Sequence, residues 1–356
     1  MLKVAKFGGS SVRDAKAIKR CGRIVTLDPD IKIVVISATA NTSNELERIA
    51  LLASQARGWE QALEDLVTRH RGLIHDLDLE EGEWFHSLEN ELWELGDLFR
   101  EEMKIDDARM DQFYSIGERI SSAIVAHYFE HSFLQRRVEL VDARGLIHTD
   151  NCYGRANPDR DMIADSAPLH FRMSEDALFV TQGFIGADGE GNTTTLGREG
   201  SDYSATLIGE AMNADAVQIW TDVPGISVID PKLIPDAPII KEIDYSCASE
   251  MARHGAKILF SKTLEPVIEK GIPVFVGSSL DADAGGTWIK PGVFSDGFVG
   301  IAVHEQRDVY KTTVVGRFKP EFLKDFEQFI SSRKPLSTTL NLDSDSFNKL
   351  VKLLIG

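Results

Sequence analysis

Residues 2–11, LKVAKFGGSS, and residues 31–38, IKIVVISA, decide the fold class of this chain. Both contain a short apolar run of strand length, and the segment between them has the pattern of a helix that ends near Leu27. The second run is apolar almost without interruption, which is typical of a strand buried on both faces of a sheet. A strand, a helix and a second strand in this order predict a parallel α/β sheet.

Long helical patterns and short strand patterns follow. From Ser43 to about Arg137, apolar residues recur at helical spacing among many charges, which predicts amphipathic helices. Further strands are expected at 138–143, 177–187, 192–197, 216–222 and 272–277, and further helices from about Asp202, near 245–256 and at 263–270. The tetrapeptide DGEG (188–191) predicts a hairpin turn between two of these strands.

The pattern of predicted helices and strands changes after residue 297. Residues 298–356 have two strand patterns, a helical pattern over 319–333, another strand pattern and a last helical pattern. This segment is too short for a large core of its own, so we expect a small C-terminal α+β appendage.

The charge balance limits what the chain can bind. It has 39 basic and 56 acidic residues, a net charge of −17, whereas nucleic acids and anionic membranes require a basic face.

No apolar run resembles a signal peptide or approaches the ~20 residues of a membrane helix, so we expect a cytoplasmic protein. The three cysteines lie far apart and predict reduced thiols. His70, His75 and His86 lie on charged helical patterns, which favours solvated side chains over metal ligands.

A phosphate site is the first candidate for chemistry. Lys6 ends the first strand, and Gly8 and Gly9 precede a helical segment. Glycines allow backbone N–H groups to turn toward an anion, and a helix N-terminus adds positive potential. The GxxxxGK[ST] spacing of a P-loop is absent, so the pattern predicts a phosphate contact only in combination with other residues.

The stretch TTTLGREGSDYSA (193–205) is the second candidate. It runs from a strand pattern through a turn into a helix, and Arg198 stands between two glycines. The planar guanidinium of Arg198 suits a carboxylate, whereas Ser201 and Asp202 suit caps of the following helix. Glu118, in SIGERIS (115–121), is an acid within a helical pattern and would suit an amine. Arginine and glutamate together could hold the two charged groups of an amino acid.

Two further segments are weak candidates when each is taken alone. Thr221 and Asp222 end a predicted strand, which is where ligands bind in open α/β sheets. Lys257 follows a glycine in HGAKIL (254–259).

The order of these motifs resembles that of the aspartokinases. KFGGSSV, SIGERIS, TQGFIGADGEGNTTTLGREGSDYSA, WTDVPGI, HGAKIL and IPVFVGSS…AGGTWI cover roughly residues 1–290, and the block 181–208 is highly specific. The resemblance implies the three-layer α/β/α sandwich of the amino acid kinase type. It implies a catalytic domain over 1–292, with a substrate lobe over about 1–200 and a nucleotide lobe over about 201–292. The implied reaction is ATP-dependent phosphorylation of the side-chain carboxylate of L-aspartate, the first step toward lysine, threonine and methionine, with Mg²⁺ as cofactor.

The resemblance also implies roles for individual residues. Lys6 would contact the transferring phosphoryl group, and Asp202 would orient lysines or phosphates. Glu118 would bind the substrate ammonium and Arg198 its α-carboxylate. The remaining implied roles are substrate contacts by Ser43 and Ser201, N–H donors at Gly8 and Gly9, and a nucleotide site lined by Thr221, Asp222 and Lys257. The resemblance implies no set of metal ligands on the protein. It is compatible with a homo-oligomer, but the sequence does not give the number of subunits.

Departures from the family pattern keep alternatives open. Ser227, Lys232 and Phe260 stand where the family usually has tyrosine, arginine and histidine, which affects the nucleotide side. A kinase for another amino-acid-like carboxylate and a catalytically silent nucleotide-binding regulatory subunit therefore remain alternatives. Residues 298–356 are at most one ACT-like remnant instead of the usual pair of regulatory domains. We expect weak or absent feedback inhibition, which half-inhibition by millimolar lysine would contradict.

Overall fold

The computed structural model describes residues 1–132, 136–173, 176–256, 261–293, 297–306 and 309–355. Its contacts divide the chain into two units, Met1–Asp222 and Val223–Gly356. The division falls after Asp222, whereas the sequence predicted a lobe boundary near residue 200. No helix in these described ranges is long and apolar enough to cross a membrane.

The first unit contains a parallel sheet with the strand order β3-β4-β2-β1-β7. Its strands are β1 (Lys3–Phe7), β2 (Ile31–Ile36), β3 (Arg137–Val141), β4 (Ala177–Gln182) and β7 (Ala216–Thr221). The apolar strands β1 and β2 are central and almost wholly buried, as their composition predicts. Lys6 lies in register between Val35 of β2 and Ile219 of β7.

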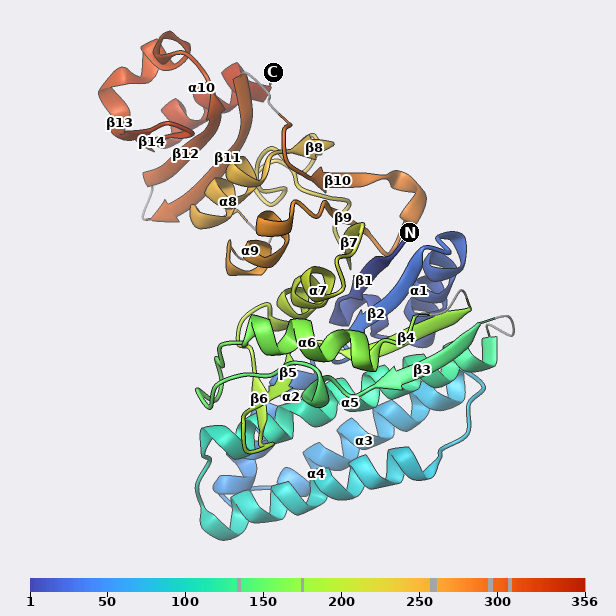
Figure 1. Ribbon diagram of the computed structural model, residues 1–356. Helices are drawn as coiled ribbons and strands as arrows, with labels where there is room; N and C mark the ends of the chain where they lie inside the picture. Colours follow the sequence, from blue (N-terminus) through green and yellow to red (C-terminus); the bar gives the residue numbers. More distant parts are fainter. Residues whose placement is uncertain (133–135, 174–175, 257–260, 294–296, 307–308, 356) are drawn as a thin grey trace. The chain divides into compact units, whose positions relative to one another are not determined.

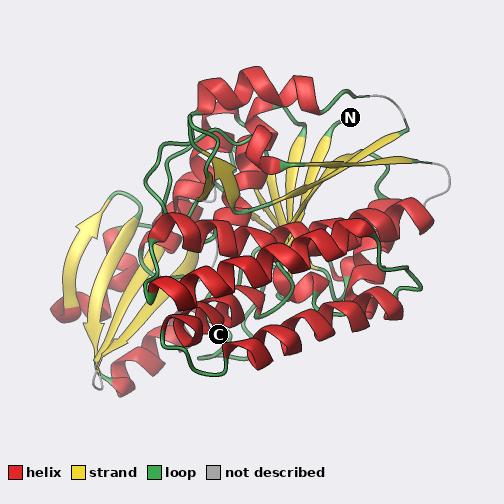
Figure 2. Cartoon of the chain, turned by 90° about the horizontal axis from the view of Figure 1, so that it is seen from below, coloured by secondary structure: helices red, strands yellow, loops and turns green. Residues whose placement is uncertain are grey.

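Helices lie on both faces of this sheet (Figures 1 and 2). They are α1 (Ala15–Leu27), α2 (Thr42–Ser54), α3 (Trp59–Asp76), α4 (Glu83–Glu102), α5 (Asp107–Ser132), α6 (Arg160–His170) and α7 (Gly200–Ala211), with the short 3₁₀ turns η1 (Gly9–Val12) and η2 (Ala143–Gly145). Helix α5 packs against β2, β3 and β4, whereas α7 packs against β1 and β7. The predicted three-layer α/β/α sandwich is confirmed. The sequence analysis did not anticipate α6.

The predicted strand over 177–187 is two strands. After β4 the chain turns at Phe184, whose φ is 71°, and continues as β5 (Ile185–Ala187). A left-handed conformation interrupts a strand because the following residues leave the plane of the sheet. β5 pairs antiparallel with β6 (Thr193–Thr195), which confirms the hairpin around DGEG.

The second unit begins with a small mixed sheet. Strand β10 (Gly286–Ile289) pairs antiparallel with β9 (Val274–Ser278) and parallel with β8 (Glu242–Ile243). Helices α8 (Tyr245–Arg253) and α9 (Ser261–Lys270) and the 3₁₀ turn η3 (Ala282–Ala284) belong to the same part of the chain. The strand and the two helices predicted here are confirmed.

The C-terminal segment is an α+β element, as predicted. Its antiparallel sheet has the order β11-β12-β14-β13 and is followed by helix α10. The elements are β11 (Gly297–Gln306), β12 (Val309–Arg317), β13 (Ile330–Lys334), β14 (Ser337–Leu342) and α10 (Ser344–Ile355). The helix predicted over 319–333 is wrong. Residues Pro320–Phe329 form a 3₁₀ segment, η4, which is kinked at Leu323, and the helical pattern ends at Phe329 because Ile330–Lys334 pairs with β14 as an edge strand.

Candidate active site

One cavity of about 630 Å³ in the first unit collects most of the predicted site residues. Its lining includes Lys6, Gly9, Ser43, Glu118, Arg198, Ser201 and Asp202. Parallel strands end at a common edge of the sheet, and the loops after β1 and β2 meet α5 and α7 there. Of the other predicted residues, Gly8, Thr221 and Asp222 do not line this cavity, and Lys257 lies outside the described residues, as does Phe260.

Glu118 is a buried acid with an unused oxygen. Its side chain is 3% exposed, and Oε1 accepts a hydrogen bond from the Ala38 amide at 3.3 Å. Oε2 is buried and has no hydrogen-bond partner in the part of the chain that the structure describes. Burial raises the pKa of Glu118 to about 8, and the bond from Ala38 opposes this shift. Burial of an unpaired carboxylate raises the free energy of the folded protein, so a cationic group bound in the cavity would stabilise the ionised form of Glu118.

Lys6 and Asp202 form an ion pair within the same cavity. Nζ of Lys6 lies 2.5 Å from Oδ1 of Asp202, and both side chains are nearly buried. A Cβ atom at Gly8 would lie 3.4 Å from this ammonium, so glycine leaves that side of Lys6 open. The amide of Gly8 itself donates to the Trp220 carbonyl at 3.2 Å. At Gly9, a Cβ atom would lie 2.8 Å from the Ala38 carbonyl, so only glycine fits there.

Arg198 and Ser201 lie at the start of α7. Arg198 is exposed at the mouth of the cavity and has no hydrogen-bond or ion-pair partner among the described residues. The predicted capping by Ser201 and Asp202 is wrong: the N-cap is Glu199, in the left-handed region with φ 56° and without a side-chain cap. Gly200 is already helical, so Ser201 and Asp202 lie inside the first turn, and a Cβ atom at Gly200 would lie 2.7 Å from the Phe184 ring. Asp202 thus occupies the first turn, where a carboxylate is favoured.

The sequence analysis missed several residues of the cavity wall. Tyr114 lies one turn before Glu118 on α5, so helical spacing could have identified it. Asp111, another turn earlier and 1% exposed, accepts bonds from the Gly154 amide at 2.9 Å and from the amide and hydroxyl of Thr195 at 2.8 and 2.7 Å. Burial nevertheless raises the pKa of Asp111. This carboxylate fixes two parts of the cavity wall to α5.

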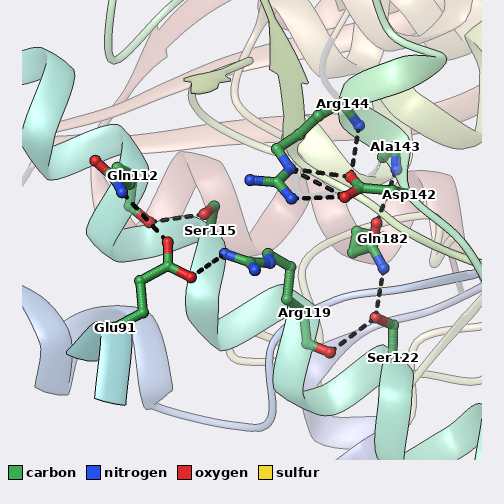
Figure 3. Close-up of polar contacts among 9 residues, drawn as sticks. All are labelled: Glu91, Gln112, Ser115, Arg119, Ser122, Asp142, Ala143, Arg144 and Gln182. Atoms are coloured by element: carbon green, nitrogen blue, oxygen red, sulfur yellow. Dashed lines mark hydrogen bonds and ion pairs between the residues drawn. The ribbon is translucent and has the colours of Figure 1, made fainter. Parts of the chain in front are cut away.

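A polar network around α5 holds that helix in place (Figure 3). Arg119, the neighbour of Glu118, pairs with Glu91 of α4 at 2.7 Å. Ser122, one turn after Glu118, accepts a bond from Gln182 at the end of β4, and Gln182 in turn accepts from the Ala143 amide, both at 2.8 Å. These contacts tie the helix that carries Glu118 to both α4 and the sheet.

The expectation of solvated histidines is wrong for His70. His75 and His86 are exposed, but His70 is fully buried on α3. The charged pattern of α3 gave no sign of this burial. His70 faces the loop after β2 and contacts the hydroxyl of Thr39 there. The described residues contain no group of three or more acidic, histidine or cysteine side chains that could hold a metal ion.

The described residues thus combine a parallel α/β fold, a glycine turn after its first strand, and a cavity lined by a lysine, an arginine and a buried acid. Residues 1–278 match the model of the amino acid kinase family, and the chain belongs to this family.

Individual relatives are aspartokinases. The chain is 38% identical over 290 residues to lysine-sensitive aspartokinase 3 of Escherichia coli, covering 80% of this chain and 63% of that protein. It is 33% identical over 287 residues to an aspartokinase of Chlamydia trachomatis, with 80% and 64% coverage. It thus spans less than two thirds of the length of these curated relatives. The crystal structure of E. coli aspartokinase III with aspartate and ADP matches with a TM-score of 0.79 and 32% identity, covering 97% of this chain and 79% of that one.

Proposed function

We propose that this protein is an aspartate kinase, which transfers the γ-phosphoryl group of ATP to the side-chain carboxylate of L-aspartate and releases ADP. One observation carries the proposal: a single cavity holds a buried carboxylate oxygen on Glu118 and an arginine, Arg198, neither of which has a partner among the described residues. A free α-amino acid supplies an ammonium for the first and a carboxylate for the second. The similar E. coli structure contains aspartate and ADP.

The chemistry requires charge neutralisation more than proton transfer. The attacking carboxylate is already ionised near neutral pH, so no general base is needed. A bond forms between its oxygen and the γ-phosphorus while the bond to the ADP oxygen breaks and its electron pair leaves with ADP. Lys6 would neutralise the phosphoryl oxygens, with Asp202 holding its ammonium in position. The absence of a side chain at Gly8 leaves room for an anion beside Lys6.

The proposal includes a nucleotide site and Mg²⁺. When bound with ATP, the metal would supply positive charge that offsets the charge of the phosphate groups. Thr221, Asp222 and Lys257 remain the proposed nucleotide contacts, and Ser43 and Ser201 the proposed further substrate contacts.

The test is ADP release with L-aspartate, L-glutamate and N-acetyl-L-glutamate in parallel, with aspartyl hydroxamate as the product readout. We expect activity with L-aspartate and a fall in kcat/KM of about 100-fold or more for Lys6→Ala and Arg198→Ala. Lys3→Ala is the matched control, because Lys3 pairs with Asp28 at 2.9 Å at the other end of β1. A preference for another acceptor, or no turnover at all, would overturn the proposal.

A further inference from the structure

The loop between β2 and α2 forms one wall of the cavity and is held from behind by α3. Its residues Ala38, Thr39 and Asn41 line the cavity, and the Ala38 amide donates to Glu118. Asn41 has φ 70°, a left-handed conformation that asparagine tolerates better than most residues. A loop in such a conformation needs outside contacts to define it, and Arg69 and His70 supply them.

His70 provides the first of these contacts. Nδ1 lies 2.8 Å from the Leu66 carbonyl, which can only accept, so Nδ1 carries the proton. Nε2 therefore accepts the hydroxyl hydrogen of Thr39 at 3.0 Å. Burial, with help from the neighbouring Arg69 charge, lowers the pKa of His70 to about 4, which keeps this neutral form at physiological pH.

Arg69 provides the second contact. Its Nη1 donates to Thr39 Oγ1 at 3.1 Å, and its Nη2 donates to Thr42 Oγ1 at 3.0 Å and pairs with Glu45 at 2.5 Å. Since the Thr39 hydroxyl donates to His70, the Thr42 hydroxyl must donate to Thr39, 2.6 Å away. The imidazole N–H and the two threonine hydroxyls of this network thus each have an acceptor, and only one set of proton positions satisfies these hydrogen bonds.

The network reaches the substrate side through Thr42. The methyl group of Thr42 lies 2.8 Å from where a Cβ atom at Gly117 would stand, so the glycine before Glu118 lets the loop approach α5. The same loop leads directly into Ser43, which lines the cavity. Displacement of the loop would therefore move the Ala38 amide and Ser43 together.

We propose that Arg69 and His70 are positioning residues that fix the loop 38–42 against α5 and thereby set the geometry in which Glu118 and Ser43 receive the amino-acid substrate. The substrate part of this inference rests on the proposed kinase activity, whereas the loop contact itself does not. Neither residue lines the cavity, so both act through Thr39 and Thr42.

The test compares Arg69→Met with Arg71→Met. Arg71 lies on the same helix, and its side chain is 31% exposed against 36% for Arg69. Its replacement also removes ion pairs, those with Glu81 and Glu89. Among the described residues, however, Arg71 does not contact the loop. For Arg69→Met we expect KM for L-aspartate to rise about tenfold, with kcat and KM for ATP changing less than about twofold. Arg71→Met should leave all three within about twofold. Equal effects of the two variants, or an unchanged KM in Arg69→Met, would overturn the inference.

Hydrogen–deuterium exchange of the unliganded protein separates this inference from the proposed function. Amides of residues 38–46 should exchange faster in Arg69→Met than in wild type and Arg71→Met. This holds whether or not the protein phosphorylates aspartate. Exchange that is unchanged, or equally faster in both variants, would refute positioning by α3. If only the wild-type assay with L-aspartate fails, the proposed function is wrong while the loop contact stands.

Discussion

Replacement of Glu118 by glutamine tests the substrate site most directly. The wild-type side chain is 3% exposed, accepts a hydrogen bond from the Ala38 amide, and has no partner for Oε2 among the residues described. With a pKa of about 8, it is mostly protonated at pH 7 in the unliganded protein. Binding of a substrate ammonium requires the carboxylate, so affinity should rise as the pH passes through this pKa.

The magnitude follows from the titration. With a pKa near 8, the ionised fraction is about one tenth at pH 7 and about three quarters at pH 8.5. A ligand that binds only the carboxylate should therefore bind about eightfold more tightly at the higher pH, which is about 1.2 kcal/mol. Glutamine keeps the shape but not the charge, and loss of a charge-assisted bond of about 1.5–3 kcal/mol should raise KM about 10- to 150-fold at pH 8.5, where wild type is mostly ionised, and correspondingly less at pH 7.

The same pKa shift predicts a change in stability. The pKa in the folded protein lies above the ordinary value of 4.5, so the unfolded chain releases this proton first. The free energy of unfolding therefore falls as the pH rises from about 4.5 to about 8. Glu118→Gln removes the penalty, and the unliganded variant should exceed wild type by up to several kcal/mol at pH 8 and by much less at pH 5.

The assays are KM for L-aspartate at pH 7 and pH 8.5, and urea unfolding without substrate at pH 5 and pH 8, for both proteins. Wild type should show the eightfold fall in KM and Glu118→Gln a high KM that does not change over this interval. The reasoning is refuted if the variant keeps the wild-type KM or the wild-type pH dependence. A variant less stable than wild type at pH 8 would refute the assignment of Glu118 as an unpaired buried acid.

Two further substitutions test the frame of the cavity. Asp111→Ala should lower the free energy of unfolding by about 3–5 kcal/mol because the Gly154 and Thr195 amides lose their acceptor. Asp111→Asn keeps one acceptor oxygen and should cost about 1 kcal/mol. Equal losses for the two variants in urea unfolding would argue against this role of Asp111. Gly183→Ala should cost about 1–3 kcal/mol, since its Cβ atom would lie 2.6 Å from that of Ser201, and should raise KM for L-aspartate; a variant with wild-type stability and KM would contradict this packing.

Most of the first unit could be predicted because its signals are local. The apolar runs of β1 and β2 indicate central strands, and the spacing in 43–137 indicates helices, without knowledge of their partners. The errors lie where tertiary contacts overrode the local pattern. Phe184, with φ 71°, divides one predicted strand into two, and the helical pattern over 319–333 forms a 3₁₀ segment kinked at Leu323 and then an edge strand paired with β14.

The chemical types of the candidate site were also visible in the sequence: a lysine before two glycines, an arginine in a turn, and an acid in a helix. Their meeting in one cavity was not, because Lys6, Glu118 and Arg198 are separated by long stretches of chain that only the fold brings together. The free oxygen of Glu118 is likewise a property of the packing, since it depends on which donors the neighbouring elements present.

His70 shows the same division between sequence and tertiary structure. The sequence determined that α3 is an amphipathic helix and that His70 lies on it. Only the tertiary structure decided that this histidine is buried, neutral and bonded to Thr39. Periodicity reports the average burial of a helix face, whereas the partner of one polar side chain depends on the loop that packs there. The sequence by itself therefore determined most of the elements and the residue types, and the folded chain decided which of them act together.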